Sequence, residues 1–234
     1  MKSLSIIALL IFFSQNIQAK IANESELGIL LAKGNSDSQS YSAKEVLSER
    51  WDNNSLKFDG RYLQTKTSGI ENARFWLTGL RYDRELSTRL ATFLGEILES
   101  NKFAGYNQKY NSDIGFKYAL TKEEKFLWNV ELGYRYTVEN QLSGTSAKLH
   151  YIRSYIEAEK KWAEGVTTKL WFEYLPNFTT GSDYQMNSEF SVSAALNNVF
   201  SLKSGYLLRY DNLPNPGAVA KTDTLLTTAL VAKF

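Results

Sequence analysis

The sequence predicts an all-β protein: a single antiparallel transmembrane β-barrel of about 12 strands that follows a cleaved signal peptide. Three observations predict this fold. They are an N-terminal export signal, a series of long segments in which apolar and polar residues alternate, and aromatic residues near both ends of those segments. Aromatic residues make up 14% of the 234 residues and there are only 3 prolines, a composition typical of strands.

The first 19 residues have the organisation of an export signal. Lys2 precedes the apolar run "LSIIALLIFF", and Ala19 ends a cleavage site of small residues. The run holds about ten residues, too few to span a membrane as a helix, and no later stretch approaches ~18 apolar residues. We therefore expect residues 1–19 to be removed and residues 20–234 to form the barrel domain, which would cross a membrane only with strands.

The rest of the chain divides into segments with a period of two. Many hold about 12–14 residues, whereas a tilted strand needs ~9–11 residues to cross the hydrocarbon core. Short turns alternate with longer connections, and an even strand number places both termini at the short-turn rim, as in outer-membrane barrels. The predicted strands are 26–33, 38–50, 55–66, 72–85, 89–101, 108–120, 125–138, 147–161, 166–178, 184–196, 199–211 and 221–234.

The stretch "FLWNVELGYRYTV", residues 126–138, indicates which face of these strands points outwards. Large apolar residues alternate in it with polar ones, among them Glu131 and Arg135. An arginine facing lipid at the membrane midplane costs about 2–4 kcal/mol, and a glutamate somewhat less. Bulky inward residues on several strands would also overfill the interior. The sequence therefore predicts an apolar face towards lipid and charged residues in the lumen.

The predicted lumen carries charges of both signs in nearly equal number, so it does not indicate selectivity for one kind of ion. Two interpretations remain open: a mutually paired network that supports the wall and partly fills the bore, and a narrow, weakly selective pore. The basic candidates are Lys57, Arg61, Arg81, Lys117, Arg135, Arg153, Lys169, Lys203 and Arg209, and the acidic candidates are Asp59, Asp83, Glu96, Asp113, Glu131, Glu157, Glu173 and Glu189.

Aromatic residues near the strand ends match the two interfacial girdles of a membrane barrel, although high strand propensity is an alternative explanation. The belt near the short turns contains Trp51, Phe126, Trp128, Trp162, Phe200 and Phe234. The belt near the longer loops contains Tyr62, Phe103, Tyr106, Tyr136, Tyr151, Phe178, Tyr184 and Tyr210.

The last segment, "TDTLLTTALVAKF", ends on Phe234 with Leu230 at an alternating position. It resembles the signal by which the barrel assembly machinery recognises its substrates, which makes that machinery an expected partner. Ala232 and Thr228 are smaller than usual at such positions.

Residues 27–62, "LGILLAKGNSDSQSYSAKEVLSERWDNNSLKFDGRY", carry a family resemblance. This strand, turn and second strand resemble the YdiY-like, salt-induced outer-membrane protein family, a domain of unknown function. The resemblance implies a stress-related outer-membrane barrel without an established activity, so no catalytic residues can be carried over.

The residues offer little for catalysis or for cofactors, and we expect no cofactor and no metal. There are no cysteines and one histidine, His150, with Ser154 about 13 Å further along the same strand face. That separation is too long for a nucleophile–base hydrogen bond. "GNSDS", residues 34–38, reads first as a turn and second as a calcium loop, and "NLPNPGAV", residues 212–219, as a stiff loop covering the pore.

These observations favour a non-enzymatic outer-membrane barrel, which is either a narrow, weakly selective passive channel or an envelope-integrity barrel. Two alternatives stay open: an outer-membrane enzyme acting on lipid or peptide, and a soluble periplasmic binding protein. The formal net charge of +2 gives no reason to expect nucleic acid. We expect contact with membrane lipid and lipopolysaccharide, whose phosphates suit basic rim residues, and the oligomeric state stays open. These rim residues are Lys66, Arg74, Lys102, Lys109, Lys148 and Lys221.

Overall fold

The computed structural model describes residues 21–33, 37–216, 218 and 220–233. They form 12 strands and a short 3₁₀ helix, η2 (Lys102–Ala104). The expected signal peptide, part of the "GNSDS" turn and Phe234 lie outside the described residues. The strands are β1 (Ala22–Ala32), β2 (Ser38–Trp51), β3 (Asn54–Thr67), β4 (Ile70–Glu85), β5 (Leu90–Asn101), β6 (Tyr106–Lys122), β7 (Phe126–Gln141), β8 (Ser146–Ala163), β9 (Val166–Pro176), β10 (Tyr184–Ala195), β11 (Phe200–Asp211) and β12 (Thr222–Lys233).

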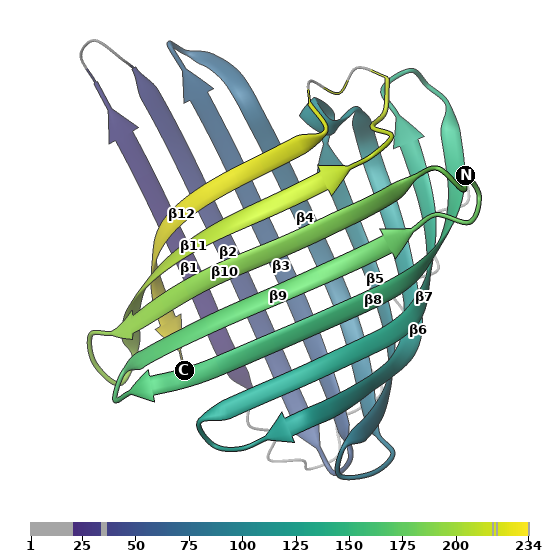
Figure 1. The fold of residues 1–234 in the computed structure, drawn as a ribbon. Helices are drawn as coiled ribbons and strands as arrows, with labels where there is room; N and C mark the ends of the chain where they lie inside the picture. The colour runs from purple at the N-terminus through teal and green to yellow at the C-terminus, as the bar shows by residue number, and fades with distance from the viewer. Residues whose placement is uncertain (1–20, 34–36, 217, 219, 234) are drawn as a thin grey trace, which may run out of the picture.

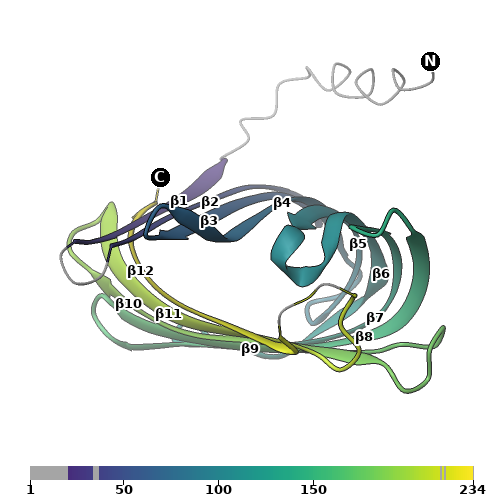
Figure 2. The same ribbon diagram turned by 90° about the horizontal axis from the view of Figure 1, so that it is seen from above.

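The strands form one closed antiparallel barrel, which confirms the predicted fold and strand number. Each strand pairs with its neighbours in the sequence, and β1 pairs with β12 to close the sheet. Figure 1 shows the steep tilt of the strands, and Figure 2 shows that the barrel is flattened, with β1–β4 on one wall and β9–β12 on the other. Within the described residues, no helix is long and apolar enough to cross a membrane.

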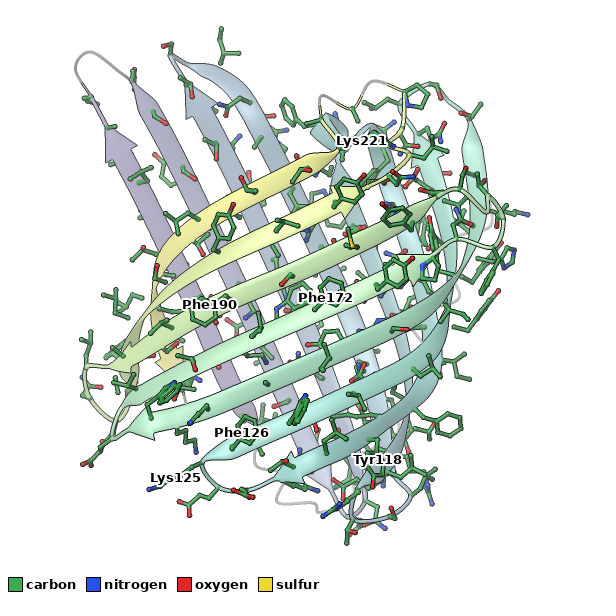
Figure 3. The ribbon with its side chains drawn as sticks, in the orientation of Figure 1. Tyr118, Lys125, Phe126, Phe172, Phe190 and Lys221 are labelled. Atoms are coloured by element: carbon green, nitrogen blue, oxygen red, sulfur yellow. The ribbon has the colours of Figure 1, made fainter. Side chains whose placement is uncertain are left out.

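The two faces of the strands differ as the alternation in residues 126–138 predicts. Leu132 of β7 is 62% exposed on the outside, while Glu131 and Arg135 are only 7% and 8% exposed in the interior. Phe172 and Phe190 stand on the outer surface in the same way (Figure 3). An interior of charged residues inside an apolar surface is the reverse of a water-soluble fold, and it is the arrangement of a membrane barrel.

The prediction of two aromatic belts on the outer surface is partly wrong. Trp128, Trp162 and Phe178 are exposed on the outside as expected. Tyr106 and Tyr151, predicted for the belt near the longer loops, are instead only 4% and 2% exposed. Tyr151 alternates with the outward Ile152, whereas Tyr106 turns inwards through the register shift between Tyr106 and Gln108.

The connections are less uneven than predicted. The segment 66–71, predicted as a longer loop, is a two-residue turn of Ser68 and Gly69, which have φ values of 51° and 76°. Two consecutive residues with positive φ form a tight hairpin turn whose twist matches that of the flanking strands. The longest connections in the structure are 177–183 and 212–221, both on the rim opposite the short turns.

The segment 102–107, predicted as a loop, contains the helix η2. Asn101 caps it, since its Oδ1 accepts hydrogen bonds from the backbone N–H groups of Phe103 and Ala104, both at 3.1 Å. Gly105 ends it with a φ of 88°, a conformation that glycine adopts without strain. The backbone N–H of Leu142 donates to the Gly105 carbonyl, so η2 is held against the end of β7.

The seam between β1 and β12 is paired along only part of its length. β1 pairs with β2 from Ala22 to Ala32, but with β12 only from Glu24↔Lys233 to Leu27↔Leu230. Towards the long-loop rim the two strands diverge (Figure 1). The barrel is therefore closed by hydrogen bonds at this seam in the half that holds Glu24 and Lys233, and it is unpaired there in the other half.

Candidate functional site

One cavity of about 760 Å³ runs inside the barrel. Gly165 and Asn197, from turns at the short-turn rim, line one end of it. Asn215 and Lys221, from the connection between β11 and β12, line the other end. The cavity is lined by residues of both rims and therefore extends along the barrel, so it is the candidate functional site.

A buried ion-pair network occupies the side of the lumen formed by β4–β9. Arg153 of β8 lies at its centre, donating to Glu131 of β7 and to Glu173 of β9 at 2.6 Å each. Arg135 binds Asp113 in a bidentate pair, with both distances 2.7 Å. Such paired geometry satisfies the buried charges, which would otherwise be costly to remove from water.

Arg81 extends this network across three strands. Its guanidinium donates to Asp83 on its own strand and to both oxygens of Glu131, at 3.0 and 2.8 Å. The two residues are 50 positions apart in the chain. Their contact is possible because the flattened barrel curves tightly at β5 and β6 (Figure 2).

An aromatic ring packs against the guanidinium groups of this network. Phe93 of β5 is 2% exposed, and the Arg81 guanidinium lies 4.2 Å from its ring centroid. The ring occupies space that Gly115 and Gly133 leave free, since an ideal Cβ at those positions would lie 2.8 and 3.2 Å from Phe93 Cζ. The ring and the ion pairs together occupy the side of the lumen formed by β4–β9.

A second charged cluster lies beside the seam. Glu26 of β1 accepts hydrogen bonds from Lys44 of β2 at 2.7 Å and from Lys203 of β11 at 2.9 Å. Lys203 also lies 3.5 Å from Glu189. Nearer the chain ends, Lys233 pairs with Glu24 at 2.8 Å. These contacts link β1 to the strands beyond β12 and support the paired part of the seam.

At the long-loop rim, the connection between β11 and β12 lines the mouth of the cavity. Asn215 Nδ2 donates to Glu139 at 2.5 Å, and Gln141 donates to Asn215 Oδ1 at 2.7 Å. Figure 2 shows this connection and η2 inside the outline of the barrel. The loop at residues 212–219 was predicted to cover the pore. The part of it that the structure describes, residues 212–216 and 218, lies at the mouth of the cavity.

Most of the predicted lumen charges lie where the sequence places them. Asp83 and Glu131 contact Arg81, and Lys117 is the cross-strand neighbour of Glu131. The remaining pairs include Glu157 with Lys169 at 2.8 Å and Arg61 with Asp59 at 3.3 Å. The cavity is lined directly by Lys57, Asp59, Arg61, Arg81, Asp113, Arg135, Arg153, Glu157, Lys169, Glu173, Glu189, Lys203 and Arg209.

The prediction that Glu96 faces the lumen is wrong, because its side chain points outwards. In β5, Gly95 and Ile97 line the cavity and Leu94 is 58% exposed, so Glu96 shares the outer face. Its carboxylate accepts a hydrogen bond of 2.6 Å from Ser112 of β6. The alternation fails here because β5 turns its apolar residues Phe93 and Ile97 inwards.

Sequence reasoning missed several interior residues and misplaced Lys109. Lys109, predicted as a lipopolysaccharide contact, is 8% exposed, pairs with Glu139 at 2.7 Å and lies 4.3 Å from the Tyr106 ring centroid. It shares the face of Asp113, a signal that the sequence contained. Glu26 and Lys44 were also missed, because neither of their strands has a clean alternation.

His150 belongs to the outer surface near the long-loop rim. Its Nδ1 lies 2.5 Å from the Tyr134 hydroxyl, and its ring centroid lies 5.2 Å from that of Tyr136. The neighbours on this face are tyrosines of β7, and the face of Ser154 continues with the exposed Ile152 and Ile156. The histidine therefore faces away from the lumen.

The fold, the outward apolar surface and the charged interior define a porin-like β-barrel. Solved structures show the same fold: the KdgM porin, with 12% identity, covers 91% of this chain and 99% of its own at a TM-score of 0.51. The NanC porin, with 10% identity, covers 92% and 98% at a TM-score of 0.50. Identity this low shows the fold alone.

The chain belongs to the family described as "Protein of unknown function, DUF481", whose sequence pattern matches residues 25–234. This match confirms that residues 27–62 resemble a domain of unknown function. It is consistent with the YdiY-like, salt-induced name but does not confirm it. A comparison with curated protein sequences finds no match.

Proposed function

We propose that this protein is a non-enzymatic outer-membrane barrel that acts as a narrow, weakly selective passive channel for small polar solutes. One observation carries the proposal: a single cavity of about 760 Å³ is lined by residues of both rims. A continuous polar route through an apolar-surfaced barrel is what passive diffusion across a membrane needs.

The balance of charges supports weak selectivity. The residues that line the cavity include 13 lysines and arginines and 10 aspartates and glutamates. Further carboxylates, among them Glu131 and Glu26, bind the lining cations directly. A lumen without a dominant sign has no strong electrostatic barrier for either cations or anions.

The outward apolar surface and the expected export signal support placement in the outer membrane, with the barrel assembly machinery as a partner. A soluble binding protein would have its apolar side chains inside, and an enzyme would need a better placed base than His150. An envelope-stress role has support only from the family resemblance, and it predicts higher expression at raised salt. Contacts of lipopolysaccharide with Lys66, Arg74, Lys102, Lys148 and Lys221 remain a proposal, which co-purification after charge reversal tests.

The channel is tested by recording purified protein in planar bilayers. We expect small unitary currents with weak ion selectivity. Lys57 lines the cavity and has no carboxylate within 4.0 Å among the described residues, so Lys57→Glu should shift the reversal potential towards cation selectivity. Lys122→Glu, at the exposed short-turn rim, is the matched charge reversal and should leave it unchanged.

A second candidate function is a structural envelope barrel without conduction. The buried network around Arg153 and the loop held by Asn215 favour it, because both reduce the free bore. If correctly folded protein in the bilayer gives no ionic current at any voltage, the result would support this function and overturn the channel proposal. Equal reversal potentials for Lys57→Glu and Lys122→Glu would also count against conduction through this lumen.

A further inference from the structure

The unpaired part of the seam leaves two free strand edges. β1 and β12 share four residue pairs, whereas β1 with β2 and β11 with β12 share 11 each. The free edges are residues 28–32 of β1 and 222–229 of β12, and all of these residues lie in the described part of the chain. At Gly28 the edges are still close, because an ideal Cβ there would lie 2.9 Å from the Thr228 carbonyl oxygen.

Free strand edges have a physical consequence inside a membrane. Each backbone N–H or C=O group that faces hydrocarbon without a partner costs several kcal/mol. Lipid chains alone therefore cannot seal this opening. Inside hydrocarbon these groups would need water from the polar lumen, or the polar part of a bound molecule, as partners.

The side chains at the opening are apolar although the lumen behind them is polar. Leu30 shares the inward face of Glu24 and Glu26 but is 61% exposed, and Leu226 on the facing edge is 72% exposed. On the inner face of β11 and β12, Leu207 and Leu225 are cross-strand partners. Three of these leucines lie at inward positions beside the opening and Leu226 lies at an outward position on its edge. We name the four together the leucine path.

A cationic group lies close to the inner end of the leucine path. Arg209 follows Leu207 by two residues, on the same face of β11, and lines the cavity. Its guanidinium lies 4.5 Å from the ring centroid of Phe75 on the opposite wall. No carboxylate of the described residues lies within 4.0 Å of it, including its cross-strand neighbour Asp223 and the nearby Asp211. It can therefore bind an anionic group that enters the lumen.

We propose that the opening between β1 and β12 is a lateral binding site for a single-chain anionic amphiphile, whose acyl chain lies along the leucine path and whose head group meets Arg209. This site goes beyond a passive channel, because its ligand reaches the lumen from the membrane. The lumen cavity that Arg209 lines has a volume of about 760 Å³, within the range of about 300–1,000 Å³ for pockets that enclose one small molecule, so the head group that meets Arg209 must be small.

Photolabelling in lipid nanodiscs tests the site, with a palmitic acid that carries a photoactivatable group in its chain as the probe. We expect adducts on the inward residues Leu207 and Leu225, and unlabelled palmitate should remove them. Val231 is also inward on β12 but lies where the seam is paired, so it should stay unlabelled. Adducts confined to outward residues would overturn the proposal.

Matched variants separate the site from general contact with lipid. Leu30→Gln should reduce the inward adducts, whereas Leu94→Gln, at an outward position of similar exposure (58%), should not. Arg209→Gln should weaken competition by palmitate but not by the uncharged hexadecanol. A phospholipid with the same photoactivatable group should label only outward residues, and equal inward labelling by it would overturn the single-chain ligand.

A reversible closure of the seam provides the sharpest test. The chain has no cysteine, so Leu30→Cys with Thr227→Cys, which continued pairing would place opposite each other, can be oxidised selectively. Inward labelling should be lost on oxidation and return on reduction, and equal labelling in both states would contradict the site. Labelling and ionic current are separate measurements, so a silent bilayer leaves this proposal standing.

Discussion

Arg153 is the residue whose removal should disturb the interior most. It donates to Glu131 and Glu173 at 2.6 Å each and lies 3.7 Å from Asp113. Its side chain is 8% exposed and none of the three carboxylates is more than 10% exposed. Arg153→Met keeps a long apolar stem but leaves these carboxylates with fewer partners.

The expected loss of stability follows from burial. Removing one partner of a buried ion pair costs about 3–5 kcal/mol. Arg81 still binds Glu131 and Arg135 still binds Glu173, so we expect the lower end of this range. A loss of about 3 kcal/mol changes the unfolding equilibrium about 100-fold.

Urea unfolding of the barrel in lipid vesicles, followed by tryptophan fluorescence, measures this change. The control is Lys122→Met, which removes an exposed pair with Glu85 at 3.5 Å and should cost about 0–1 kcal/mol. Arg153→Met combined with Glu131→Gln should cost less than the sum of the single changes, by about 0.5–3 kcal/mol. Equal midpoints for Arg153→Met and Lys122→Met would refute the argument that this network stabilises the fold.

Three further changes test other parts of the structure. Gly115→Ala puts a Cβ within 2.6 Å of the backbone of β7, so it should lower the free energy of unfolding by about 1–3 kcal/mol; an unchanged urea midpoint would contradict the close packing. Asn215→Ala removes the hydrogen bonds to Glu139 and Gln141, and bilayer recordings should show larger or more variable currents, whereas identical current histograms would speak against a cover. Glu96→Leu removes an outward carboxylate and should stabilise the barrel in vesicles by about 1–2 kcal/mol; a loss of stability would mean that this carboxylate does not face lipid.

Local alternation predicted the strand faces well where one face was uniformly apolar and the other uniformly polar. In β7, Glu131 and Arg135 point inwards and Leu132 outwards, as their spacing indicates. In β5 the alternation is mixed, and the prediction for Glu96 was wrong. The reason is that Phe93 fills space left by two glycines of β6 and β7, which turns an apolar face inwards. Packing between strands overrode the pattern within one strand.

Rim positions were harder to predict than strand centres. Lys109 and Tyr106 lie near a strand end, where a residue can reach lipid, loop or lumen. The register shift between Tyr106 and Gln108 changes which side chains face inwards there. Lys109 keeps the alternation of Asp113, so its inward placement could have been predicted, but its pairing with Glu139 of the neighbouring strand at 2.7 Å could not. A partner on another strand leaves no mark on local spacing.

The sequence by itself determined the barrel class, the number of strands and the separation of an apolar from a charged face. These properties follow from a period of two within each strand, which is local. Only the tertiary structure decided which charges meet, such as Arg81 with Glu131, and that β1 and β12 pair over part of their length. Both depend on how the sheet flattens and closes, and closure joins residues from opposite ends of the chain.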